Sequence, residues 1–434
     1  MFFISHRMKK CNLKERLEIK ECRVKIMKSI HFSNNLSVES RISNTETVDS
    51  SYLHSPLFTL QSDRINTICA SIGIGIPPGG YNDRRMINLH SKAGNHMAKH
   101  KRGKSSFFFE NAPVISAWAS IAGKKEAEGP LGKTFDETTS DTFFGQKTWE
   151  QAEKKMQELC LKKLLEKANL HTWDIDLVFS GDLLNQCIGS SFSLRNMNIP
   201  HLGLYGACST MAESLLLAAM TVDGGYADRV AALTSSHFAS SERQYRFPLG
   251  YGGQRTPTAQ WTVTGSGSAL VTNQGTGPRI TAATVGTVRD LGIKDPGNMG
   301  AAMAPAAYAT IRSHFEDLGT SVQDYDMVVT GDLGQLGKEL LMELAQRDGL
   351  EFGGKLTDCG NLVFDNTVQD VHAGGSGCGC SAITLCGHLL GELSRGKLKK
   401  ILFCGTGALL SPTSTQQGLP IPGVCHAVAI EGGK

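Results

Sequence analysis

Runs of apolar residues alternate with helix-like segments along most of the chain after residue 100. Short apolar runs, each long enough for one buried strand, lie at 113–120, 175–179 and 229–234. Helices are predicted at 149–169, 185–197 and 211–222, and the first of these places apolar residues near helical spacing. This alternation of strands and helices is typical of an α/β layered sheet.

The pattern breaks between residues 235 and 260, where we expect a long loop. Loops of this length inside a compact domain are usually functional or disordered, and the mixture of aromatic residues and arginines here favours order. Arg243 and Arg246 lie in this loop, where an arginine either faces solvent or holds a carboxylate bidentately. Two strand-like runs follow, at 261–272 and 279–288.

Residues 1–96 differ from the rest of the chain. The first 30 hold nine Lys and Arg against three Glu, and the remainder is rich in Ser and Asn with no sustained period. Such a segment cannot bury enough apolar surface to order itself. It is either a basic, disordered arm that touches acidic partners or an upstream stretch outside the natural product, and we favour the second interpretation.

Composition narrows the class of protein. The chain has 434 residues, 40% of them hydrophobic and 20% charged, which is typical of a globular protein with two packed halves. A net charge of +3 is too close to neutral to indicate nucleic-acid binding. The 12 cysteines are scattered through apolar segments, which indicates a reducing compartment and mostly free thiols. No apolar run is long enough to span a bilayer.

The second half of the chain repeats the first. The segment 175–183 recurs 150 residues later as 325–333, with Asp182 matched by Asp332 in a Gly-Asp-Leu sequence. Cys208-Ser209 recurs as Cys380-Ser381, and in both copies a glycine follows the cysteine after 16 residues. This indicates a duplication, whose pseudo-twofold would bring two helix N-termini to one central place. The predicted units are the extension 1–96, a first half 97–288 and a second half 289–434.

The chain is organised around the stretch 203–210, which predicts a short strand, a tight turn and a cysteine, Cys208, opening a helix. A thiol at a helix N-terminus meets unpaired N–H groups and the positive end of the helix dipole, and both favour thiolate. The same place, with Ser209 beside it, suits an anionic ligand. The alternative is that Cys208 is a small buried apolar side chain, which is the usual fate of a free cysteine.

Several motifs resemble the thiolase and ketoacyl-synthase superfamily and, more specifically, the stage V sporulation protein AD family of spore-forming Firmicutes. The matching stretches are Lys124–Gly132, Gly181–Gln186, Gly206–Thr210, Glu242–Arg246, Thr264–Ala269, Gly292–Pro296, His372–Cys378 and Gly405–Pro412. They spread over nearly all of 100–431. The resemblance implies a thiolase-like α/β fold, in which two duplicated halves form five αβαβα layers around a pseudo-twofold. It also implies a homodimer, joined through the strand 201–205.

The resemblance further implies that the protein binds dipicolinic acid (pyridine-2,6-dicarboxylate), with or without calcium, during its uptake into the forespore. Partner proteins of the same operon, several of them membrane proteins, come with that role, as does a location at the periphery of the spore inner membrane. No other cofactor is predicted. Asp182 and Asp332 would repel a bare dianion but could help to bind a calcium ion. The candidate ligand-binding residues are Cys208, Ser209, Asp182, His237, Arg243, Arg246, Asp332, His372 and Cys380.

The alternative function is an acyltransferase or condensing enzyme with Cys208 as its nucleophile. Condensing relatives also use two basic or polar residues from the second half, usually His with His or Asn, to activate the substrate and hold the oxyanion. The corresponding places here carry Asp332 and the stretch 378–380, neither with a histidine. His237 and His372 are the remaining stand-ins, each near a turn. The cysteines at 378, 380 and 386 do not match zinc-site spacing, so no metal site is predicted from them.

Overall fold

The computed structural model describes residues 98–245 and 254–433. Residues 94–434 belong to one compact unit. The expectations for residues 1–96 and for Arg246 lie outside the described residues.

In this part of the chain, ten strands follow one hydrogen-bonded path, whose two halves have the same internal order. The first half contains β3 (Val114–Ala122), β9 (Gly265–Thr272), β7 (Arg229–Ser236), β5 (Leu177–Gly181) and β6 (His201–Leu204). β5 is parallel to β6 and β7, and β9 is antiparallel to both β7 and β3. β6 therefore forms one outer edge.

The second half of the path contains β10 (Arg279–Val285), β15 (Gly423–Glu431), β14 (Lys400–Ala408), β11 (Met327–Thr330) and β12 (Leu356–Asp358). β11 is parallel to β12 and β14, and β15 is antiparallel to both β14 and β10, as in the first half. The two sets of strands meet at the pair Val114 and Arg279. β10, which a boundary at 288 assigns to the first half of the sequence, thus lies in the second sheet.

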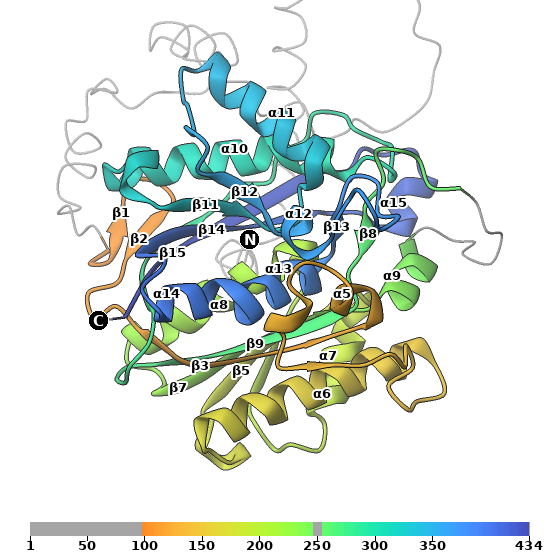
Figure 1. Ribbon diagram of the computed structural model, residues 1–434. Helices are drawn as coiled ribbons and strands as arrows, with labels where there is room; N and C mark the ends of the chain where they lie inside the picture. The colour runs from red at the N-terminus through yellow and green to blue at the C-terminus, as the bar shows by residue number, and fades with distance from the viewer. Residues whose placement is uncertain (1–97, 246–253, 434) are drawn as a thin grey trace, which may run out of the picture. The chain divides into compact units, whose positions relative to one another are not determined.

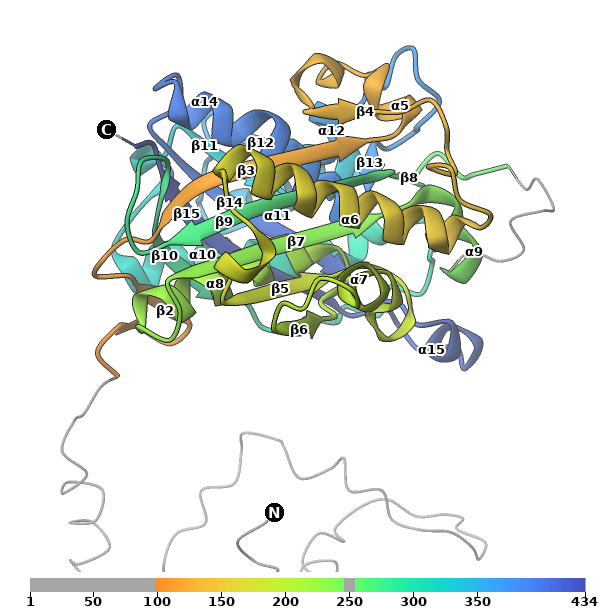
Figure 2. The same ribbon diagram turned by 90° about the horizontal axis from the view of Figure 1, so that it is seen from below.

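Helices cover both outer faces and fill the space between the two sheets (Figure 1). α6 (Trp149–Ala168) crosses β3, β9 and β7, with α7 (Ile188–Leu194) beside it (Figure 2). α8 (Thr210–Asp223) contacts strands of both sheets, and α13 (Cys378–Thr384) packs beside it. α10 (Met299–Leu318) and α11 (Gly334–Arg347) cover the second sheet. This order of layers confirms the predicted thiolase-like αβαβα fold.

The long outer helices begin and end where their sequences supply caps. Thr148 accepts a hydrogen bond from the Gln151 N–H at the start of α6, and Asn298 accepts one from the Ala301 N–H at the start of α10. Both helices end at a left-handed residue, Asn169 and Gly319 respectively. α8 is apolar on nearly every side because it lies between two sheets.

The remaining short elements lie at the ends of the sheets or in the connections. They are β1 (Lys101–Arg102), β2 (Ser106–Phe108), β4 (Glu137–Thr138), β8 (Trp261–Thr262), β13 (Gly375–Ser376), α5 (Lys124–Ala127), α9 (Phe238–Tyr245), α12 (Cys359–Val363), α14 (Leu390–Ser394) and α15 (Pro412–Gln416). Among the described helices, none has both the length and the apolar character needed to cross a membrane.

Two sequence predictions need correction. The expected loop at 235–260 contains the helix α9, whose first N–H, from Phe238, is received by the Thr264 hydroxyl at 3.1 Å. A cap supplied by a residue 26 positions away leaves no local signal. The helix predicted at 185–197 is shorter, because residues 185–187 form a 3-10 turn with left-handed backbone at Gln186 and Cys187.

Candidate functional site

The turn that carries Cys208 is tight and held by its own side chains. Between β6 and α8, residues Ala207–Ser209 form a single 3-10 turn, and Ala207 has a left-handed backbone with φ +51°. The Ser209 hydroxyl donates to the Gly206 carbonyl oxygen at 2.7 Å, and the Thr210 hydroxyl donates to the Ala207 carbonyl oxygen at 2.6 Å. Ser209 is therefore used inside the turn, and Cys208 is left facing a cavity.

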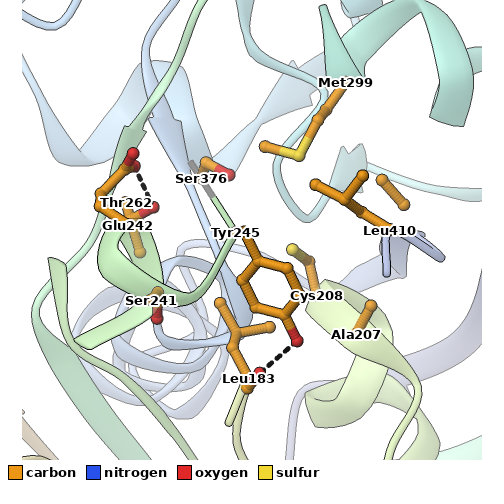
Figure 3. A pocket seen from close by; sticks show the side chains of 11 residues that line it. Leu183, Ala207, Cys208, Ser241, Glu242, Tyr245, Thr262, Met299, Ser376 and Leu410 are labelled. Atoms are coloured by element: carbon orange, nitrogen blue, oxygen red, sulfur yellow. Dashed lines mark hydrogen bonds between the residues drawn. The ribbon is translucent and has the colours of Figure 1, made fainter. Parts of the chain in front are cut away.

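That cavity lies where the ends of both halves meet (Figure 3). Its lining residues are Leu183, Ala207, Cys208, Ser241, Glu242, Tyr245, Thr262, Met299, Ser376, Ala408 and Leu410. The cavity is narrow and has an accessible volume of only about 40 Å³. Cys208 is 5% exposed. Within the described residues the lining contains no lysine, arginine or histidine.

Asp332 reaches Cys208 from the second half. It is fully buried, and its carboxylate accepts hydrogen bonds from the Thr406 hydroxyl at 2.7 Å and the Gly377 N–H at 2.9 Å. The Cys208 thiol forms a further side-chain hydrogen bond with it. Burial raises the pKa of Asp332 to about 7, although these hydrogen bonds act in the opposite direction. The carboxyl group is therefore part protonated near neutral pH.

Asp182 lies at the corresponding place in the first half but serves a different purpose. Its carboxylate accepts from the Leu184 N–H at 2.9 Å, from the Ser190 N–H at 2.8 Å and from the Ser190 hydroxyl at 2.7 Å. Glu153 lies near it, buried and bonded to the Ser240 hydroxyl at 2.7 Å. Burial raises the pKa of both acids, and the charge of Asp182 raises that of Glu153 further. Asp182 thus anchors the turn after β5.

The second helix-opening cysteine does not reach the cavity. Cys380 is buried in the main hydrophobic core, and burial raises its pKa well above the usual range. Cys378, two residues earlier, is the cysteine that packs with Cys208 and Leu183. Its thiol donates to the Ser235 carbonyl oxygen at 3.0 Å. Cys378, rather than Cys380, therefore packs against Cys208.

The two candidate histidines lie outside the cavity lining. His237 is buried, with Nε2 2.8 Å from the Thr142 carbonyl oxygen, and burial lowers its pKa. His372 has Nδ1 2.7 Å from the Thr256 carbonyl oxygen, and its Nε2 lies 3.0 Å from the Asp370 carboxylate. Each ring thus has at least one local partner of its own.

Arg243 points away from Cys208. Its guanidinium pairs with Glu150 and lies 5.2 Å from the centroid of the Trp149 ring. It lines a separate hollow between α6, α7 and α9. Arg246 falls among the residues that are not described.

The cavity contains residues that the sequence patterns did not single out. Ser241, Glu242 and Tyr245 come from α9, and Thr262 from β8 donates its hydroxyl to Glu242 at 2.8 Å. Ser376 adds another hydroxyl from β13. The four-residue spacing of Ser241 and Tyr245 would have placed them on one face of a helix, had this segment been predicted helical.

Comparison with known proteins identifies relatives over most of this compact unit. The family model "Stage V sporulation protein AD" matches residues 103–431. The Stage V sporulation protein AD of Bacillus subtilis (strain 168) is 46% identical over 329 residues, which cover 76% of this chain and 97% of that protein.

Among solved structures, the 3-oxoacyl-(acyl carrier protein) synthase III of Xanthomonas oryzae pv. oryzae matches with 15% identity and a TM-score of 0.48, covering 75% of this chain and 100% of that one. Cerulenin-bound OleA of Xanthomonas campestris matches with 16% identity and a TM-score of 0.46, covering 76% and 98%. The family model extends across both halves and all the residues that line the Cys208 cavity. This chain therefore belongs to the stage V sporulation protein AD family.

Proposed function

We propose that this sporulation protein binds dipicolinic acid in the cavity beside Cys208 and supports its uptake into the developing forespore. Membership of the stage V sporulation protein AD family supports a role in sporulation. The protein would act at the periphery of the spore inner membrane, together with membrane proteins of the same operon. A homodimer is part of the same proposal.

The observation that carries a binding function, rather than acyl transfer, is the contact between Cys208 and Asp332. A nucleophilic cysteine is activated by a neighbouring base or cation that favours the thiolate. A carboxylate neighbour instead accepts the S–H and favours the protonated thiol. Among the described residues of the cleft, none therefore supplies the activation that a condensing enzyme needs at this cysteine.

The same acid can favour a diacid ligand. Because burial raises the pKa of Asp332 to about 7, its protonated form is well populated near neutral pH. A protonated carboxyl group donates a hydrogen bond, which an ionised one cannot do. In its protonated form Asp332, which contacts Cys208, would donate to one ligand carboxylate, while Ser241 and Ser376 supply hydroxyl groups from the cavity lining.

Calcium would depend on the ligand for much of its coordination. Across 98–245 and 254–433, no three His, Cys, Asp or Glu side chains form a cluster able to hold a metal ion. Calcium takes six to eight oxygen ligands. The two carboxylates and the ring nitrogen of dipicolinate would have to supply several of these positions, and Glu242 is the acid among the described lining residues.

Calorimetric titration of the full chain with dipicolinate, with and without calcium, tests the proposal. We expect stoichiometric binding to the parent and none to Cys208→Trp, whose indole would fill the narrow cavity. Circular dichroism of Cys208→Trp checks that the fold is intact. Equal binding by the parent and by Cys208→Trp would show that dipicolinate does not bind in this cavity. If Cys208 instead forms a covalent thioester with an acyl-CoA, acyl transfer and not ligand binding is the function of this cavity.

A further inference from the structure

Tyr245 occupies part of the cavity in which the proposed function places the ligand. Its ring lies beside Cys208, and its hydroxyl points to Leu183 (Figure 3). The open space of about 40 Å³ around it admits only a few water-sized occupants. A flat six-membered aromatic ring of the protein therefore fills the slot that a flat aromatic ligand would need.

Hydrogen bonds hold this ring in place. The Tyr245 hydroxyl donates to the Leu183 carbonyl oxygen and lies 2.7 Å from the Tyr205 hydroxyl. The Tyr205 hydroxyl also donates to the Leu183 carbonyl oxygen, at 3.4 Å. Gln244 donates to the same carbonyl oxygen at 3.0 Å and accepts from the Asn185 N–H at 3.1 Å. The end of α9 is thus fastened to the segments that follow β5 and β6.

We infer that Tyr245 is an internal plug that sets the shape of the ligand: its ring leaves the slot, and a flat aromatic acid of similar outline takes its place. The identity of that acid rests on the proposed function. On displacement the Leu183 carbonyl oxygen keeps its bond from Gln244. The Tyr205 hydroxyl loses its bond to Tyr245 and keeps the Leu183 carbonyl oxygen, 3.4 Å away, as its acceptor. A ligand that is bulky or non-planar would not fit the space the ring vacates.

The rate at which a reagent alkylates the Cys208 thiol reports how often Tyr245 leaves the slot, and this measurement needs no ligand. Tyr245→Phe keeps the ring but removes both hydroxyl contacts, so the open state should be more populated. We expect iodoacetamide to alkylate Cys208 about fivefold faster or more, the factor for one net hydrogen bond of roughly 1 kcal/mol. Mass spectrometry of the Cys208 peptide gives the rate.

Two controls separate opening from general loosening. Tyr226→Phe alters a tyrosine that is 87% exposed and outside the cavity lining, so it should leave the Cys208 rate unchanged. Cys187 is 6% exposed, close to the 5% of Cys208, and serves as an internal reference within each variant. A Cys208 rate that is the same in parent and Tyr245→Phe, or that rises only together with the Cys187 rate, would overturn the plug.

Dipicolinate titration then tests whether the ligand takes the place of the ring. A plug competes with its ligand, so Tyr245→Phe should bind about fivefold more tightly, in proportion to the open population. Weaker binding by this variant would show that Tyr245 holds the ligand and would overturn displacement. Faster alkylation with no dipicolinate binding in either protein would support the plug and overturn the proposed function.

Discussion

Asp182 and Asp332 occupy the same place in the two halves, directly after a buried strand and within the same Gly-Asp-Leu sequence. Asp182 is used within its own half, where it accepts from the N–H groups of Leu184 and Ser190. Asp332 instead contacts Cys208 from the other half. One repeated acid therefore stabilises a turn, while its counterpart contacts the cysteine that lines the cavity.

A third acid explains the difference. Asp358, at the end of β12, accepts from the Leu333 N–H at 2.8 Å and from the Gly334 N–H at 3.0 Å. Gly334 is the counterpart of Leu184, so Asp358 performs in the second half the task that Asp182 performs in the first. Asp332 is thereby released from its own turn. The comparison teaches that the neighbours of a repeated residue, rather than the repeat itself, decide its role.

The largest effect expected from this comparison is on pH dependence. Asp332 has a pKa of about 7 in the folded protein, against an ordinary value of 3.8. Between these values only the folded state holds the proton, so the contribution of Asp332 to stability is full below pH 4 and declines as pH rises through 7. That decline is at most about 4 kcal/mol. Asp332→Asn should remove it, as measured by urea unfolding at several pH values.

Glu126→Gln is the matched control for this prediction. Burial raises the pKa of Glu126 to about 7 as well, but its carboxylate accepts from the Thr264 N–H outside the cavity lining. Glu126→Gln should reduce the fall in unfolding free energy with rising pH to a similar extent, while leaving dipicolinate binding unchanged. A parent profile that Asp332→Asn does not alter between pH 4 and 7 would contradict the raised pKa.

Removing Asp358 should lower the free energy of unfolding at neutral pH by nearly as much as the decline expected from Asp332. Asp358→Ala leaves the buried N–H groups of Leu333, Gly334 and Gly360 without their acceptor. At about 1 kcal/mol for each lost partner, we expect a loss of about 3 kcal/mol in unfolding free energy, measured in urea. Asp290→Ala is the control, because it removes the same type of turn bond, to the Gly292 N–H, at the surface. Equal losses in the two variants would contradict the assigned role of Asp358.

The sequence predicts features that local patterns determine. The apolar runs of β5 and β11 and the Gly-Asp-Leu repeat were visible because each depends on neighbours in the chain. The placement of Cys208 at a helix start followed from the small residues around it. The resemblance to a family added the order of the layers, which no single segment contains.

Features that depend on distant residues were not predictable in this way. α9 is polar and short, and its first N–H is capped by Thr264 from the segment between β8 and β9. The pairing of Arg243 with Glu150, which turns the guanidinium away from the cavity, joins residues 93 positions apart. Helix phase also decided that Cys378, and not Cys380, packs with Cys208.

The two outer edges of the sheets differ as well. β6 carries Leu202, which is 54% exposed, whereas Leu356 on β12 is half-buried. An exposed apolar edge strand needs a cover, and the proposed homodimer would supply one. Leu202→Asp should then weaken dimerisation by about 2 kcal/mol, or roughly thirtyfold.

Light scattering over a range of protein concentrations measures this effect. Leu419→Asp is the control, because Leu419 is 50% exposed but lies on neither edge strand. A parent protein that is monomeric at micromolar concentration, or one that both variants leave dimeric, would refute the interface at β6.

The two cysteines that the sequence repeat predicts at helix starts, Cys208 and Cys380, give a smaller effect. Cys208→Ala should weaken dipicolinate binding about tenfold, because a thiol that lines the cavity and contacts Asp332 is lost. Cys380→Ala lies in the core, so it should lower the melting temperature without changing the affinity. Calorimetry and thermal unfolding of both variants measure these effects. If Cys380→Ala weakens binding more than Cys208→Ala does, the assignment of the cavity to the first helix start is wrong.

The smallest effect is expected from the part of the chain that precedes the described unit. Deleting residues 1–96 should change the melting temperature by no more than about 1 °C, because their composition supports no core of their own and the family match begins at residue 103. A deletion through Phe109 is the contrasting variant. It removes the buried Phe109 and the Ser106 hydroxyl that bonds Thr284 at 2.8 Å and Asp317 at 3.0 Å. That variant should melt several degrees lower, and a comparable drop on deleting 1–96 alone would show that the extension contributes to the fold.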